Sequence, residues 1–201
     1  MIIEYFPQYS QEWWDARIGI PTASKFDKLV SSTGKKSTQW KSYAYKKAAE
    51  IDTCKIEDTF KSKDMERGTM LEPIARSDYN FITGIEMQEV GIVYPDSNKL
   101  CSCSPDGLSI VNKKGLEIKC PKASTHKEYE HKNVLPTKYK HQVFGSLWIC
   151  DEIETWDFMS YHPDMKPFIT TIDRENEEYK TYIKMLASFL PEVSEFIKKV
   201  A

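Results

Sequence analysis

The sequence predicts an α/β fold in which a mixed central β-sheet is flanked by helices. Two patterns indicate this class: helical signals come before and after the middle of the chain, and short segments of alternating polarity lie in the middle. A third observation is length, because 201 residues suit one domain with a substantial core. We therefore expect a single domain over residues 1–201.

Helices are expected on both sides of the sheet. Ser10 is a typical N-cap for a short helix, which the segment from Gly19 to Pro21 would end. Longer helices are expected at residues 22–30, 38–51, 60–82, 124–132, 136–150 and 175–200, and Pro191 is a candidate break in the last of them.

The expected strands cover residues 85–94, 100–104, 107–111, 116–120, 155–161 and 168–172. Alternation in the segment Leu-Glu-Ile-Lys-Cys places Glu117 and Lys119 on one face of a strand, opposite its apolar residues. Residues 112–115 are polar and end in Gly, which predicts a hairpin turn. That hairpin would bring Asp106 close to Glu117.

Two carboxylates and an ammonium on a rigid sheet are suited to a hard divalent cation with a proton-handling lysine. The alternative is structural. Ser-Pro-Asp-Gly at residues 104–107 is a common turn sequence, and a strand with Glu and Lys on one side is often only a solvated face.

Asp106, ten intervening residues and Glu117-x-Lys119 resemble the signature of the PD-(D/E)XK nuclease superfamily. The longer strings at residues 103–108 and 115–121 resemble its lambda exonuclease-like branch, the YqaJ-type viral recombinases. An independent string, Trp-x-x-x-Arg-x-Gly-x-x-Thr-Ala-Ser at residues 13–24, resembles the same branch. The resemblance extends over about residues 13–196 and implies a restriction-endonuclease-like core.

The resemblance implies a Mg²⁺-dependent 5′→3′ exodeoxyribonuclease that acts on linear double-stranded DNA and leaves 3′ overhangs for recombination. Mn²⁺ is a possible substitute, and two ions per site are expected. The implied metal ligands are Asp106, Glu117, the backbone carbonyl of Ile118 and Glu72. For Glu72, the alternative is an exposed helix glutamate.

The resemblance also assigns the other roles. Lys119 would orient or deprotonate the attacking water, or neutralise charge on the phosphorane. Gln142 would orient the water or Lys119. A 5′-phosphate pocket would consist of Arg17, Ser24 and Ser104. The alternative for that pocket is that Arg17 pairs with Asp15 or Glu12, and that Ser24 only caps a helix.

The formal net charge is −2, so contact with DNA requires a local basic patch. Residues 31–49 contain no acid, and their lysines include Lys35, Lys36 and Lys41, which we expect to contact DNA phosphates. The alternative is a solvated helix whose aromatic residues, Trp40, Tyr43 and Tyr45, face the core.

No apolar run approaches the length of a transmembrane helix, and the first residues do not resemble a signal peptide. We therefore expect a cytoplasmic protein, and the resemblance implies a phage or prophage gene in a bacterial host. The five cysteines should be reduced. A zinc or iron–sulfur site at Cys101, Cys103 and Cys120 is the less favoured alternative, because the spacing is unsuitable and no fourth ligand is evident.

The resemblance also implies a homotrimer and a single-strand annealing protein as partner. An apolar stripe on the terminal helix would help a subunit interface or, as is more common, pack on its own domain; its residues are Tyr182, Met185, Phe189, Val193 and Phe196. Two rival functions remain: an endonuclease or junction resolvase with the same metal site, and a non-catalytic DNA-binding subunit. Against the second, every expected catalytic position is filled.

Overall fold

A four-stranded mixed sheet lies at the centre of the computed structural model, which describes residues 1–56 and 62–201. Its strands, in spatial order, are β3 (Gly107–Ser109), β4 (Lys114–Lys119), β5 (Thr155–Ser160) and β6 (Phe168–Asp173). Only β4 and β5 are parallel; the two outer pairings are antiparallel. A parallel pair needs a crossover, and helices α4 (Ala123–Lys132) and α5 (Thr137–Ile149) provide it.

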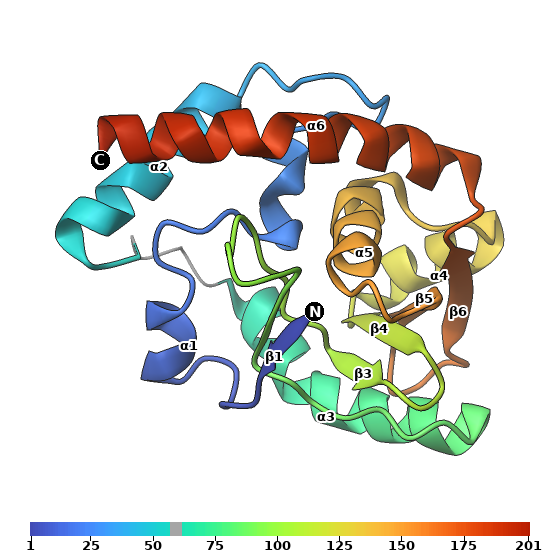
Figure 1. Cartoon of the computed structure of the whole chain (residues 1–201). Helices are drawn as coiled ribbons and strands as arrows, with labels where there is room; N and C mark the ends of the chain where they lie inside the picture. The colour runs from blue at the N-terminus through green and yellow to red at the C-terminus, as the bar shows by residue number, and fades with distance from the viewer. Residues whose placement is uncertain (57–61) are drawn as a thin grey trace.

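Helices cover both faces of the sheet, and Figure 1 shows α3 (Lys63–Thr83) on the side opposite α6 (Glu177–Val200). Toward α3, Leu116 and Ile118 pack with Tyr79 in a small apolar cluster. Toward α5, Trp156 and Phe158 belong to the larger core. The strand alternation predicted for residues 116–120 is therefore confirmed, since Glu117 and Lys119 point away from the α3 cluster.

Close approach in the larger core depends on two glycines. A Cβ on Gly115 would lie 2.2 Å from an atom of the Trp156 ring, and one on Gly145 would lie 2.5 Å from the Phe26 ring. Gly115 therefore lets Trp156 lie flat on β4, and Gly145 lets α5 pack against the 3₁₀ helix η1 (Ala23–Lys28).

The N-terminal part of the chain lies beside this sheet (Figure 1). Its elements are β1 (Ile2–Glu4), which pairs antiparallel with β2 (Ile92–Tyr94), the short helix α1 (Gln11–Asp15) and α2 (Trp40–Thr53). Ser10 caps α1, as predicted, by accepting a hydrogen bond from the Trp13 backbone. Helix α2 packs along α6, where the Trp40 ring meets Phe189 and Phe196 edge-on.

Most of the expected elements are confirmed, and the differences have physical causes. Residues 85–91 and 100–104 form isolated bridges rather than strands. Of the helix expected at residues 22–30, Ala23–Lys28 form a 3₁₀ helix, and α6 continues through Pro191 because buried side chains hold it on both sides. Helix α3 begins at Lys63; the expected start at residue 60 lies outside the described residues. Strand β1 was not among the predicted strands.

None of the helices in the described part of the chain is long and apolar enough to span a membrane.

Candidate active site

The hairpin of β3 and β4 fixes Asp106 against the middle of β4. The backbone N–H of Asp106 donates to the Leu116 carbonyl at 3.2 Å. Its carboxylate oxygen Oδ2 accepts from the Ile118 N–H at 2.6 Å. Asp106, which is only 8% exposed, therefore lies beside the strand that carries Glu117, as the sequence predicts.

Glu117 lies at the centre of the site with no solvent exposure. Its Oε1 forms an ion pair with the Nζ atom of Lys119, whereas its Oε2 is buried without a hydrogen-bond partner. Burial raises the pKa of Glu117 to about 8, against the opposing effect of the Lys119 ammonium. An orphaned, desolvated carboxylate oxygen is unfavourable, and a bound cation would relieve it.

Glu72 reaches the same place from α3. Burial raises its pKa to about 9, and the neighbouring Asp106 carboxylate adds to the increase. Glu72 is half-buried, so the alternative of an exposed helix glutamate does not hold. Three carboxylates from β3–β4 and α3 thus influence one another through a poorly solvated space.

For Lys119, the effect of neighbouring charges on the pKa outweighs the effect of burial. Burial by itself lowers its pKa, but the carboxylates of Glu117 and Asp106 raise the pKa overall. Lys119 is consequently a firmly held ammonium in the metal-free protein. The lowered pKa that a proton-abstracting role would need, next to bound cations, stays a prediction.

The donor set fits a divalent cation, although the carboxylates are engaged with protein donors. Among the residues that the structure describes, no three His, Cys, Asp or Glu side chains form a group that could hold a metal ion by themselves. The candidate ligands include a backbone carbonyl, that of Ile118, and the orphaned Oε2 of Glu117 supplies a free acceptor. Binding of a cation by Glu117 would require the ion pair between Lys119 and Glu117 to weaken.

The predicted phosphate pocket is assembled around Ser104. Its Oγ accepts from Trp13 Nε1 at 2.9 Å and from Arg17 Nη1 at 3.3 Å. Because two hydrogen bonds use the acceptor capacity of this hydroxyl, its own proton is left to donate into the pocket. The Arg17 guanidinium stacks on the Trp13 ring, 4.0 Å from the centroid.

Ser24 joins this pocket from η1, where its hydroxyl lies 3.2 Å from that of Thr22. No ion pair links Arg17 to Asp15 or Glu12, both of which lie in the described part of the chain, so the alternative pairing is not formed. Burial lowers the pKa of Arg17, which means that its charge is poorly solvated and that a bound anion would stabilise it.

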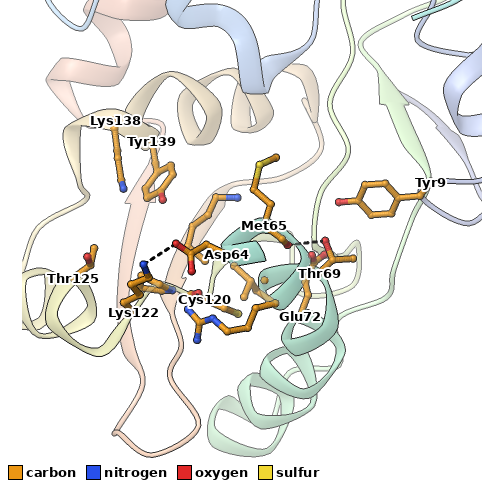
Figure 2. A pocket seen from close by; sticks show the side chains of 15 residues that line it. Tyr9, Asp64, Met65, Thr69, Glu72, Cys120, Lys122, Thr125, Lys138 and Tyr139 are labelled. Carbon is orange, nitrogen blue, oxygen red and sulfur yellow. Dashed lines mark hydrogen bonds and ion pairs between the residues drawn. The ribbon is translucent and has the colours of Figure 1, made fainter. Parts of the chain in front are cut away.

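Two cavities meet at the carboxylates. The first, called the Arg17 cavity, is about 550 Å³ and includes Arg17, Ser24, Ser104, Asp106 and Gln142 in its lining. The second, called the Lys138 cavity, is about 410 Å³ and is lined partly by Lys138, Tyr139, Lys122 and Ile118 (Figure 2). Glu72 and Lys119 line both cavities, whereas Asp106 and Gln142 line the Arg17 cavity and not the Lys138 cavity.

Three lysines of the acid-free segment, Lys35, Lys36 and Lys41, lie outside both cavities, whereas Lys46 and Lys47 of the same segment line the Arg17 cavity. Lys36 pairs with Glu192 at 2.6 Å, and Lys41 lies over the Trp40 ring. Lys35 is exposed in the loop before α2. Contact of these three with DNA stays a prediction.

Sequence reasoning missed several residues of the Arg17 cavity. Lys25 and Lys28 line it from η1, and Glu50, whose buried carboxylate lies 2.8 Å from Lys47, forms part of its wall. The i, i+3 spacing of that pair was the available signal. Trp13 is buried, and nothing in the sequence indicates its hydrogen bond to Ser104.

The cysteines are free thiols. Cys103 lies 3.7 Å from Cys150, sulfur to sulfur, whereas Cys120 packs at the α3 cluster. The alternative metal site at Cys101, Cys103 and Cys120 is therefore not formed in the described chain.

Comparisons with known proteins identify the family of this chain. The family model of the YqaJ-like viral recombinase domain matches residues 12–153. Two crystal structures of LHK-Exo, an alkaline exonuclease from Laribacter hongkongensis, resemble the chain with TM-scores of 0.78 and 0.79 and with 28% and 29% identity. Each comparison covers 95% of this chain and 96% of the other, and one of those crystals contains dAMP.

A phage-related exonuclease from Haemophilus somnus 129PT has a TM-score of 0.62 and 15% identity, covers 90% of this chain and 96% of its own, and supports the fold alone. No curated protein matches the sequence. The family model spans more than half of the chain, and the LHK-Exo structures match nearly all of it. The chain therefore belongs to the YqaJ-like viral recombinase domain family, has the PD-(D/E)XK nuclease fold and is a nuclease.

Proposed function

We propose that this chain is a Mg²⁺-dependent exodeoxyribonuclease that degrades one strand of linear duplex DNA from its 5′ end and leaves 3′ single-stranded overhangs. One observation carries the proposal: the Arg17 cavity, with Ser104, adjoins the carboxylates, and Asp106 follows Ser104 by two residues. A terminal 5′-phosphate held at Arg17 would place the first phosphodiester next to Glu117 and Lys119. The dAMP bound by LHK-Exo is a deoxynucleoside monophosphate, the class of product that such a reaction releases.

Nucleases of this family usually need a divalent metal ion. We assign its ligands to the carboxylates of Asp106 and Glu117 and to the Ile118 carbonyl, with Glu72 completing a second position. When bound, two Mg²⁺ ions would stabilise the charge that develops on the attacking and leaving oxygens. Mn²⁺ has the same preference for oxygen ligands and is the expected substitute.

The remaining steps belong to the protein's own side chains. Lys119 holds the attacking water and offsets negative charge at phosphorus, and Gln142, which lines the Arg17 cavity, orients that water. The water oxygen bonds to phosphorus while the bond to the 3′ oxygen breaks. The mononucleotide leaves with a 3′-hydroxyl, and the shortened strand keeps a new 5′-phosphate, which can enter the Arg17 cavity in turn.

The larger assembly follows from the family. We propose that residues 1–201 act as one nuclease domain, that three copies assemble, and that a single-strand annealing protein receives the overhang. Action in the cytoplasm of a bacterial host is the corresponding prediction.

Digestion of linear duplex labelled separately at each end tests the proposal. With Mg²⁺, the 5′ label should appear first as a mononucleotide, whereas the 3′ label should remain in long strands; EDTA should stop both. Cutting of closed circular duplex would favour the endonuclease or resolvase alternative instead. Binding without any release of nucleotides would favour the non-catalytic subunit.

A further inference from the structure

The Lys138 cavity has no role in the reaction as described so far. It adjoins the Arg17 cavity at Glu72 and Lys119, which line both, whereas Lys138 and Tyr139 line the Lys138 cavity and not the Arg17 cavity. Figure 2 shows Lys122 and Thr125 on α4, Lys138 and Tyr139 on α5, and Glu72 on α3, around one space. Its basic residues are Arg67, Lys119, Lys122 and Lys138.

Lys138 provides a positive charge that forms no close ion pair in the described chain, although it interacts with the Glu128 carboxylate at longer range. Its Nζ lies 4.8 Å from the centroid of the Tyr139 ring and 5.5 Å from that of Tyr129. No Asp or Glu in residues 1–56 and 62–201 forms an ion pair with it, whereas Lys140 on the same helix pairs with Glu178. An exposed lysine that lies against two tyrosine rings and outside any close ion pair is suited to an anion from outside the protein.

Tyr139 connects this lysine to the catalytic group. The Nζ of Lys119 lies 5.5 Å from the centroid of the same ring. Lys119 and Lys138 are therefore both held against one aromatic side chain, one next to the carboxylates and the other farther into the cavity. Two phosphates of one strand could be held in that order.

The two helices that begin at this cavity, like α2, have no acid in the first turn. Helices α3 and α6 each have a side-chain cap and two acids in the first turn, as the helix dipole favours. Helices α4 and α5 have neither, and they begin with a lysine at the N-cap, Lys122, and at the second position, Lys138. Lys122 is offset by Asp64, 3.0 Å away, whereas Lys138 forms no ion pair in the described chain. The start of α5 is therefore the place where an anion from outside would be favourable.

The direction of the strand determines which phosphate would be bound. If the 5′-phosphate is in the Arg17 cavity and the first phosphodiester is at Glu117, the uncut strand must leave on the opposite side. The Lys138 cavity meets the Arg17 cavity at Glu72 and Lys119, so it offers the strand a path that leads away from Arg17.

We propose that the Lys138 cavity binds the second phosphodiester of the digested strand, one nucleotide beyond the scissile bond, with Lys138 as its principal cation. This inference rests on the proposed 5′→3′ exonuclease function. It gives the enzyme three phosphate positions in a row. After each cut, the strand advances by one nucleotide, and the phosphate held at Lys138 becomes the next one to be cleaved.

The subsite is tested by removing the charge of the phosphate, the charge of Lys138, or both. The substrate is a 5′-phosphorylated duplex, either unmodified or with a neutral methylphosphonate at the second linkage, and release of the first nucleotide is followed in a single turnover with Mg²⁺. We expect wild type to be slowed about tenfold by the modification, the loss typical of one charge-assisted contact. Lys138→Gln should be slowed about tenfold on unmodified DNA but little further on modified DNA.

Lys127→Gln is the matched control, because Lys127 is exposed on α4, pairs with Glu130 and lines neither cavity. It should behave as wild type on both substrates. A wild-type rate that is unaffected by the methylphosphonate, or additive losses in Lys138→Gln, would overturn the subsite.

Measurements of DNA affinity distinguish two failures, that of the subsite and that of the proposed exonuclease function. Fluorescence anisotropy with the same duplexes in EDTA measures affinity without catalysis. If wild type cleaves no substrate, the proposed exonuclease function fails, and the subsite is then judged by affinity alone. It survives only if the methylphosphonate weakens binding by wild type and not by Lys138→Gln.

Discussion

At the scale of single residues, Glu117 shows the conflict between folding and catalysis most clearly. A fully buried carboxylate with one oxygen lacking a partner destabilises the metal-free protein. The same oxygen is what a divalent cation would bind. We infer that this unfavourable group persists because the metal needs it.

Glu117→Ala should abolish cleavage and leave DNA binding largely intact, because phosphate contacts come from other residues. Loss of a metal ligand removes several kcal/mol of transition-state stabilisation, so we expect a decrease of about a thousandfold or more in single-turnover rate. Calcium should support binding by wild type without turnover, because its looser coordination does not hold the reacting groups in line. A Glu117→Ala protein with near wild-type cleavage would contradict the assignment of the metal site.

Arg17→Ala should remove most of a preference for 5′-phosphorylated over 5′-hydroxyl duplex ends. The lost contact is a charge-assisted one, roughly 1.5–3 kcal/mol, which corresponds to about a 10- to 150-fold effect on the rate with phosphorylated ends. Comparison of initial rates on the two end types measures it. Arg17→Lys serves as the control, since it keeps the charge but loses the planar fork and should restore only part of the preference. Equal digestion of both end types by wild type would disprove the pocket.

Residues of the site were predictable where they belong to a contiguous motif. Asp106, Glu117 and Lys119 follow from alternation and one hairpin, and the structure places them together. The lining from Lys25, Lys47 and other distant segments was not predictable in this way, because it depends on how η1 and α2 pack against α5 and α6. Contacts of that kind have no local pattern.

At the scale of elements, β4 both carries residues of the active site and packs closely against β5. Its Glu117 and Lys119 form the site, while Gly115 leaves room for the Trp156 ring on the adjacent strand. The position of the catalytic strand therefore depends on a close contact that no larger residue permits.

Gly115→Ala should lower the free energy of unfolding by about 1–3 kcal/mol, since the added methyl group overlaps the Trp156 ring. Urea denaturation measures the change. Gly68→Ala is the control: nothing lies within 4 Å of its added Cβ, and it is in α3, so stability should increase by up to about 1 kcal/mol. If Gly115→Ala proves as stable as wild type, the close contact is not a constraint on β4.

Elements with a long periodic pattern were predicted with small errors at their ends, as for α2, α5 and α6. The errors lie where pairing partners are distant in sequence. Strand β1 has three residues and exists because β2, some 90 residues later, pairs with it. Residues 100–104 have a strand-like pattern, but only Ser102 and Cys103 form single bridges, to Thr22 and Val93.

At the scale of the whole molecule, the position of the basic side chains matters more for DNA binding than the net charge. The net charge of −2 would not suggest a DNA-binding protein, yet basic side chains line both cavities at the carboxylates. Local concentration of cations along the path of one strand is sufficient for phosphate contact. We therefore expect strong salt dependence of DNA binding despite the acidic overall balance.

The last prediction concerns assembly. The stripe on α6 was one candidate interface, but Tyr182, Phe189 and Val193 are buried in the chain's own core, with Met185 and Phe196 packed against it. A trimer must therefore be held together by another surface, and polar substitutions in the stripe should unfold the chain rather than dissociate it. We predict that light scattering at micromolar concentration gives three times the mass of the chain. Phe189→Asp should lose secondary structure by circular dichroism instead of giving a folded monomer, because a buried charge without a partner is strongly destabilising. A monomeric mass for wild type would contradict the trimer, and a folded, monomeric Phe189→Asp protein would return the interface to α6.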